Sequence, residues 1–162
     1  MPDHPQENTD LDSALEAAAE EPIEEEEQAE DDIKMMIVMR RDLRMRKGKI
    51  AAQAGHACVQ ATLDALSRLP EDNPQEEQEA IEERFPFLFW LNHGQKKVCV
   101  YVDGEDALLN VYRSLEARGI HAALIQDAGH TEFHGEPTLT CLATEPRAAA
   151  DLDPVTGVLP LY

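Results

Sequence analysis

The sequence predicts a layered α/β fold for residues 33–162. Short apolar runs with β-branched residues alternate in this part of the chain with longer segments of helix-forming composition. The whole chain of 162 residues is 43% apolar, enough for one hydrophobic core that buries about two thirds of the unfolded surface. We therefore expect a single compact domain that does not depend on disulfides.

The composition of two neighbouring segments predicts the first strand and the first helix. Residues 35–39 form a short apolar run with charged residues on both sides, which is typical of a central strand covered on both faces. Residues 49–69 lack an internal proline and are rich in Ala, Leu and Gln, so we expect a helix that ends at Pro70. Gly55 is the weak position of this helix.

The second half of the domain repeats the alternation. Residues 97–102 form another β-rich run, and residues 103–106 have the pattern of a capping box that opens a helix. Gly119 predicts the end of that helix. Two further apolar runs, residues 121–126 and 138–144, predict strands on either side of a polar loop that contains glycine.

Two segments are strongly acidic. Residues 1–32 hold 14 Asp and Glu and no Lys or Arg, so only −5 of the net charge of −19 belongs to the rest of the chain. Charge repulsion and the scarcity of apolar residues predict a disordered tail over residues 1–32. Residues 71–83 are also acidic and predict a solvated helix or loop. Residues 85–90, which hold four aromatic side chains, are predicted to be core beneath a helix.

The cysteines and the apolar runs indicate the cellular compartment. An odd number of cysteines without close pairs fits a reducing cytoplasm and offers no zinc spacing; they are Cys58, Cys99 and Cys141. The longest apolar run, residues 35–39, is far shorter than the roughly 18–20 residues of a spanning helix. The acidic N-terminal residues do not resemble a signal peptide. We expect a soluble cytoplasmic protein with no membrane partner.

A basic segment interrupts this acidic sequence. Residues 34–49 carry seven Lys and Arg against a single acid, Asp42. A positive loop that leads into a helix N-terminus suits a phosphate-bearing ligand such as RNA or a nucleotide. A solvated turn that neutralises the acidic segments remains an equal alternative. Residues 46–49 do not form a Walker loop, because the upstream glycine of that motif and the Ser or Thr after its lysine are both missing, which disfavours an ATPase.

Polar residues at regular spacing mark a possible cleft. Lys49, Gln53 and His56 lie at i, i+4 and i+7, on one face of the predicted helix. Asp127 follows a predicted strand, where α/β sheets bind ligands, although the sequence alone slightly favours a cap for the turn at Gly129. The other histidines are too scattered to indicate a metal site, and we expect none.

Several motifs occur together in a characteristic order. They are Lys47-Gly-Lys-Ile-Ala-Ala-Gln53, His56-Ala57, Gly94-Gln-Lys-Lys97, Asp127-Ala-Gly129 with Thr131, Thr138-Leu-Thr140 and Asp153-Pro-Val-Thr-Gly157. In this combination the chain resembles the archaeal and eukaryotic type of peptidyl-tRNA hydrolase from Lys34 to Tyr162. The resemblance implies a three-layer α/β/α domain around a four-stranded mixed sheet. It also implies hydrolysis of the ester between a peptide and the 3′ end of tRNA, without metal or cofactor.

The resemblance also implies the residues of the site. The positions implicated in catalysis fall on Lys49, Gln53, His56, Asp127, Thr131 and Thr140. The expected tRNA-binding cations are Arg40, Arg44, Arg46, Lys47, Lys96 and Lys97.

Ester cleavage needs a positioned water, a proton acceptor and donors to the developing oxyanion. We hypothesise that Asp127 orients or deprotonates the water and that Lys49 stabilises the oxyanion or a terminal phosphate. Gln53 and the two threonine hydroxyls then hold the geometry, and His56 is the second choice as base. The sequence names no Ser or Cys with a base and an orienting partner, so direct attack by water is favoured over a covalent intermediate.

The chain departs from the usual family pattern at four positions. Arg46, His130, Glu132 and Pro160 stand where the family usually has Gly, Arg or Lys, Gln, and Lys. His130 and Glu132 lower the positive charge beside the site, whereas Arg46 raises it. A second function therefore stays open: a tRNA- or protein-binding adaptor on the same fold with weakened catalysis.

The expected partner is peptidyl-tRNA, and the sequence leaves a homodimer open. Two contacts are conceivable for the acidic residues 1–32, namely the basic segment of the same chain or a protein partner. Stacking on the unpaired tRNA end is the alternative role of residues 85–90.

Overall fold

The computed structural model describes residues 32–69 and 85–162. The predictions of a disordered tail and of a second acidic segment at residues 71–83 lie outside the described residues, except for Asp32. No helix in the described part is both long and apolar enough to cross a membrane.

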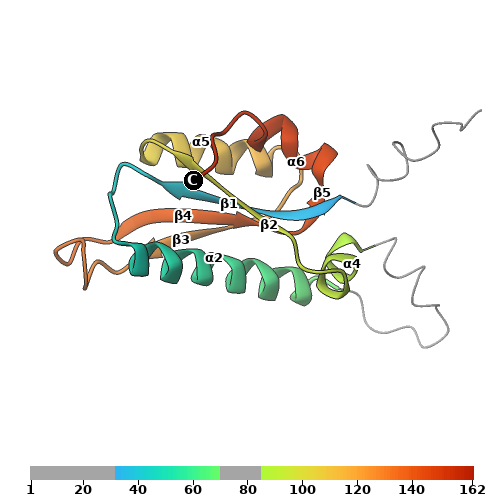
Figure 1. The fold of residues 1–162 in the computed structure, drawn as a ribbon, viewed down its shortest axis with the longest axis horizontal. Coiled ribbons are helices and arrows are strands. Elements are labelled where there is room, and N and C mark those ends of the chain that lie inside the picture. The colour runs from blue at the N-terminus through green and yellow to red at the C-terminus, as the bar shows by residue number, and fades with distance from the viewer. Residues whose placement is uncertain (1–31, 70–84) are drawn as a thin grey trace, which may run out of the picture.

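A mixed sheet forms the middle of the domain (Figure 1). Its strands are ordered β2-β1-β4-β3, with β1 parallel to β2 and β4 antiparallel to both of its neighbours. A short strand, β5, pairs with the start of β1. The bounds are Ile33–Arg40 for β1, Lys97–Val102 for β2, Ala122–Asp127 for β3, Thr138–Thr144 for β4 and Arg147–Ala148 for β5. The predicted strands are confirmed.

Helices cover both faces of this sheet. The long helix α2 (Lys47–Ser67) and the short helix α4 (Pro86–Asn92) lie on one face, whereas α5 (Glu105–Glu116) and α6 (Ala149–Thr156) lie on the other (Figure 1). The three-layer arrangement implied by the resemblance is thus present. Phe87 and Trp90 of α4 are buried in the core, as predicted for the aromatic cluster.

Strand β1 divides the core between the two faces. Met35 and Met39 belong to the cluster beneath α2, whereas Met36 and Val38 belong to the cluster beneath α5. All four side chains are almost completely buried. Successive residues of a strand point to opposite faces, so a strand covered on both sides must be apolar at every position. The uninterrupted apolar run therefore predicts the central position of β1 correctly.

The predicted capping box of α5 is wrong. The helix begins after Gly104, whose φ is 124°, and no side chain caps it. Asp103 instead accepts two hydrogen bonds from the Arg41 guanidinium, at 2.9 and 2.6 Å. Because the Asp103 carboxylate is bound to Arg41, which lies in the connection between β1 and α2, it does not cap the start of α5. Gly119, with φ 71°, follows the end of the helix as expected.

Arg40 is enclosed at the end of β1. Arg40 is only 8% exposed. Its guanidinium donates to both carboxylate oxygens of Asp42 (3.1 and 2.7 Å), to Glu105 (2.9 Å) and to the backbone oxygen of Leu139 (3.0 Å). These bonds tie β1 to the starts of α5 and β4. Arg40 therefore connects elements of the fold and is not one of the exposed cations expected to meet tRNA.

Replacing Arg40 tests this structural role. Arg40→Ala is expected to lower the free energy of unfolding by about 1.5–3 kcal/mol, because it removes charge-assisted hydrogen bonds to Asp42, Glu105 and the backbone oxygen of Leu139. Arg41→Ala removes the same charge from an exposed pair and should lower it by less than about 1 kcal/mol. Urea unfolding of both variants provides the comparison, and equal losses would contradict the structural role.

Candidate active site

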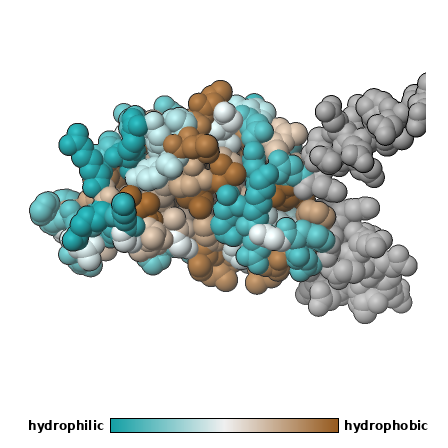
Figure 2. All heavy atoms as spheres, in the orientation of Figure 1, coloured by the Kyte–Doolittle hydropathy of each residue, from teal (hydrophilic) through white to brown (hydrophobic). Residues whose placement is uncertain are grey.

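The candidate site lies at one edge of the sheet. Strands β1, β2 and β3 run in the same direction, so their carboxyl ends meet at this edge. Helix α2 starts here, and the β3–β4 loop (residues 128–137) extends beside it (Figure 1). Hydrophilic residues dominate this end of the molecule (Figure 2). Carboxyl edges of this kind are where α/β sheets bind ligands.

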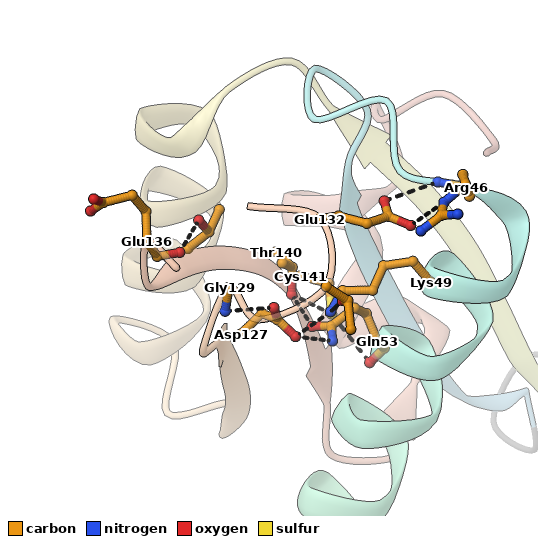
Figure 3. Close-up of polar contacts among 11 residues, drawn as sticks. Arg46, Lys49, Gln53, Asp127, Gly129, Glu132, Glu136, Thr140 and Cys141 are labelled. Atoms are coloured by element: carbon orange, nitrogen blue, oxygen red, sulfur yellow. Dashed lines mark hydrogen bonds and ion pairs between the residues drawn. The ribbon is translucent and has the colours of Figure 1, made fainter. Parts of the chain in front are cut away.

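A cation and a carboxylate meet at the centre of the site (Figure 3). Lys49, in the first turn of α2, places its Nζ 2.5 Å from Oδ2 of Asp127, the last residue of β3. The same ammonium donates to Oγ1 of Thr131 at 3.0 Å. The side chains of Lys49 and Asp127 are only 12% and 14% exposed, so water screens their attraction weakly.

A buried amide and hydroxyl hold the carboxylate from below. Gln53 donates from Nε2 to Oδ2 of Asp127 at 2.9 Å, and its Oε1 accepts from the Thr140 hydroxyl at 2.5 Å. Gln53 and Thr140 are 1% and 0% exposed. The hydroxyl of Thr140 satisfies the amide oxygen, so the amide nitrogen faces the carboxylate. The i, i+4 spacing of Lys49 and Gln53 brings both onto this one acceptor.

Asp127 caps the turn at Gly129, as its sequence position suggested, and also joins the polar network of the candidate site. Its Oδ1 accepts from the backbone N–H of Gly129 at 2.9 Å, which stabilises the turn, while Oδ2 serves Lys49 and Gln53. The Lys49 ammonium, above all, holds the pKa of the Asp127 carboxyl below its usual value, and the hydrogen bonds from Gly129 and Gln53 add to this effect. Partial burial opposes the shift. The carboxylate is therefore ionised at neutral pH.

His56 lies outside this network. Its side chain is exposed on α2, and no hydrogen bond or ion pair joins it to another of the described residues. The helix face predicted to carry three functional groups thus brings two of them, Lys49 and Gln53, to Asp127.

The thiol nearest the site is buried. The Sγ of Cys141 lies 3.4 Å from the backbone oxygen of Gln53, and burial raises the pKa of this thiol to about 12. It is therefore protonated at neutral pH, which agrees with the expectation that water rather than a cysteine attacks. No group of three or more His, Cys, Asp or Glu that could hold a metal ion is present in residues 32–69 and 85–162.

The predicted tRNA-binding cations divide between two ends of the sheet. Arg44 and Lys47 are exposed at the candidate site, and Arg46 is exposed there too but pairs with Glu132. Lys96 and Lys97 lie at the opposite end, because Lys97 pairs with Met35 near the start of β1. There Lys96 is bound to Asp32 at 2.5 Å, and the Lys97 ammonium lies 4.5 Å from the centre of the Trp90 ring.

Two residues of the β3–β4 loop make contacts at the site that the sequence did not predict, although Glu132 was expected to lie beside it. The ring of Phe133 lies 5.5 Å from the Lys49 ammonium, within cation–π distance. Glu132 accepts from Nε of Arg46 at 2.8 Å and from its backbone N–H at 3.3 Å. An aromatic residue inside a polar loop could have indicated Phe133, but no spacing rule connects Glu132 to Arg46, 86 positions away.

The fold and the site define an α/β domain with a partly buried lysine–aspartate pair at the carboxyl edge of its sheet. Residues 33–162 match the family model described as Peptidyl-tRNA hydrolase PTH2. The chain is 42% identical over 130 residues to the peptidyl-tRNA hydrolase of Methanocaldococcus jannaschii, a match that covers 80% of this chain and 99% of the relative. The chain therefore belongs to the PTH2 family of peptidyl-tRNA hydrolases.

One further comparison agrees with this assignment, and another concerns the fold. The chain is 39% identical over 131 residues to the probable peptidyl-tRNA hydrolase 2 of Drosophila melanogaster, covering 81% of this chain and 62% of that protein. A solved structure of a protein of unknown function from Agrobacterium strain C58 matches with a TM-score of 0.51 and 13% identity, over 81% of this chain and 98% of the other. The latter supports the fold alone.

The Asp127 carboxyl provides a test of the network. Its titration midpoint should lie below the usual value in the wild type and rise in Lys49→Met, because the largest stabiliser of the charged form is lost. Carbon-detected NMR of the carboxyl group measures this midpoint. The pKa of Asp127 is lower in the folded state than in the unfolded state. The pair with Lys49 therefore stabilises the fold fully when the pH is above the unfolded-state pKa, and this contribution is lost as the pH falls through the folded-state pKa.

Lys47→Met is the matched control for this titration. It removes the same charge from the same helical turn, but Lys47 is exposed and does not contact Asp127 among the bonds of the described residues. An equal rise in both variants would show that general charge, and not the direct bond, lowers the Asp127 pKa.

Gly129 provides a test of the loop geometry. A Cβ at Gly129 would overlap the backbone of Glu136, with its nitrogen at 2.7 Å, whereas a Cβ at Gly135 would meet nothing within 4 Å. Both glycines have positive φ, 83° and 86°, so either change to alanine should cost about 1–2 kcal/mol. Gly129→Ala should cost about 1–3 kcal/mol more through overpacking. Thermal unfolding that ranks the two variants equally would contradict this close approach.

Proposed function

We propose that the protein hydrolyses the ester bond of peptidyl-tRNA and so releases free peptide and reusable tRNA. The single observation that carries this proposal is the convergence of Lys49, Gln53 and Asp127 at the carboxyl edge of the sheet. Membership of the PTH2 family supports the substrate class.

The ammonium of Lys49 is suited to stabilise developing negative charge. It has three N–H donors, of which one is bonded to Asp127 and one to Thr131. The third can donate to the carbonyl oxygen of the ester, whose charge grows as water attacks. Both existing bonds fix the direction of the third, so little reorganisation is needed during the reaction.

Asp127 is better suited to orient the attacking water than to remove its proton beforehand. A general base is most effective when its pKa lies near the working pH, but the Asp127 pKa is lowered by Lys49. The carboxylate can still accept a hydrogen bond from water and direct its oxygen toward the carbonyl carbon. In the net reaction the water hydroxyl joins the acyl carbon and the ribose oxygen leaves with a proton.

Substrate phosphates have a matching surface beside these groups. Arg44 and Lys47 are exposed near the start of α2, where the backbone N–H groups and the helix dipole also favour anions. We assign these two residues to tRNA binding. Lys96 and Lys97 contact tRNA only if the bound tRNA extends to the opposite end of the sheet.

The remaining assignments rest on the sequence. The proposed compartment is the cytoplasm, where tRNA is reused in translation, and the three cysteines are free. A homodimer and a contact of the acidic residues 1–32 with the basic segment or with a protein partner are proposed as before.

Removing either central charge should abolish most of the activity. Lys49→Met and Asp127→Asn are expected to lower kcat by about 10²–10³-fold, the usual effect of losing one donor to a developing oxyanion or its support. Single-turnover release of peptide from N-acylated aminoacyl-tRNA measures this loss. Lys47→Met is the control of equal charge and should raise KM with little change in kcat.

The same assay distinguishes the hydrolase from the alternative function, a tRNA- or protein-binding adaptor on the same fold. No observation favours an adaptor that has lost the reaction. The adaptor would be supported, and the hydrolase overturned, by two results together. The wild-type chain would release no peptide, and the Asp127→Asn variant would bind peptidyl-tRNA as tightly as the wild type does.

A further inference from the structure

The β3–β4 loop contacts the start of α2 through three consecutive side chains. Thr131 accepts a hydrogen bond from Lys49, Glu132 is bonded to Arg46, and Phe133 places its ring beside the Lys49 ammonium. One of these three contacts, Glu132 with Arg46, is made entirely outside the Lys49–Asp127 network (Figure 3).

The Glu132 carboxylate is firmly held. Both of its oxygens accept from Arg46, one from the guanidinium at 2.8 Å and one from the backbone N–H at 3.3 Å. The side chain of Glu132 is 14% exposed, whereas that of Arg46 is 79% exposed. A covered carboxylate depends on its partners more strongly than an exposed guanidinium does. The pair therefore anchors the loop to the backbone of the helix start, as well as to one arginine.

Backbone hydrogen bonds within the loop connect this anchor to Gly129 and Asp127. Gly135 and Phe133 donate their backbone N–H groups to the oxygen of Gly129 at 3.0 and 3.3 Å, and Glu136 donates to the oxygen of Phe133 at 2.9 Å. Asp127 in turn accepts from Gly129. Movement of Glu132 away from Arg46 would thus displace the neighbouring Thr131 from Lys49.

We propose that the Arg46–Glu132 ion pair is a latch that holds the β3–β4 loop against α2 and thereby fixes Thr131 on the Lys49 ammonium. Arg46 and Glu132 are positioning residues, because they act through Thr131 and Lys49. This inference rests on the proposed hydrolase function. It differs from the role in tRNA binding expected for Arg46, since a phosphate contact changes affinity whereas a latch changes the catalytic step.

The kinetic test is a double-mutant cycle on the full chain with N-acylated aminoacyl-tRNA as substrate. Arg46→Ala and Glu132→Ala should each lower kcat by about tenfold with little change in KM, because a misplaced catalytic group loses rate rather than binding. The double variant should lose no more than either single one, as expected for two residues that act as one unit. Glu132→Gln keeps an acceptor oxygen and should retain more of kcat than Glu132→Ala.

Two matched controls separate the latch from general charge effects. Glu136→Ala removes the same charge from the same loop, and the Glu136 side chain points away from the site (Figure 3), so kcat should not change. Arg44→Ala removes an exposed cation from the same β1–α2 connection and should raise KM without lowering kcat. A Glu132→Ala variant that lowers KM and leaves kcat intact would overturn the latch, because Glu132 would then only repel phosphate. Losses that multiply in the double variant would overturn it as well.

A second measurement does not require activity. Amide hydrogen exchange at Phe133, Gly135 and Glu136, whose N–H groups are bonded within the loop, should become faster in Arg46→Ala and Glu132→Ala than in Glu136→Ala. Unchanged exchange would overturn the latch even if the chain is an active hydrolase. Faster exchange in a chain that hydrolyses nothing would retain the latch as a contact and reject the proposed function instead.

Discussion

The ion pair between Lys49 and Asp127 is the interaction on which the rest of the site depends. It joins the first turn of α2 to the last residue of β3, two elements that otherwise touch mainly through apolar side chains. A partly buried carboxylate is stable only if its oxygens have donors, and here Lys49, Gln53 and Gly129 supply them. The arrangement that stabilises the charge also leaves one donor of the ammonium for a ligand. Stability and reactivity thus have the same origin.

Sheet topology brings these distant residues together. Because β1 and β3 run in the same direction, the connection that follows β1 and the loop that follows β3 emerge at the same edge. Helix α2 then packs across the face of β3 and β4, so that Gln53 reaches Thr140 beneath the carboxylate. Both partners are fully buried, which makes a change of the Gln53 amide orientation costly. The buried pair therefore acts as a rigid floor under the exposed end of Lys49.

Local sequence patterns could predict the elements but only part of the site. The apolar run of β1 and the proline-free composition of α2 depend on neighbouring residues, and both predictions are correct. The capping box failed because Asp103 pairs with Arg41, a partner that local pattern does not reveal. Lys49 and Asp127 are likewise 78 positions apart, and the family resemblance, not their spacing, placed them in one site. Long-range ion pairs form wherever the fold brings opposite charges together. The sequence therefore identifies the charged residues that could form such pairs, but it does not show which of them are partners.

The strongly negative net charge says little about the field at the site. At physiological ionic strength the screening length is about 8 Å, so a phosphate near α2 responds to the charges next to it. There Arg44 and Lys47 remain exposed, while Glu132 neutralises Arg46 and lowers its value as a phosphate contact. Arg46 lowers the pKa of the Glu132 carboxyl, so Glu132 is ionised at neutral pH and can pair with Arg46. If the pair is a latch, Arg46 contributes to a fixed loop beside Lys49 instead of to phosphate binding. A better-positioned catalytic group raises kcat without tighter binding of the substrate, which favours turnover when substrate is abundant.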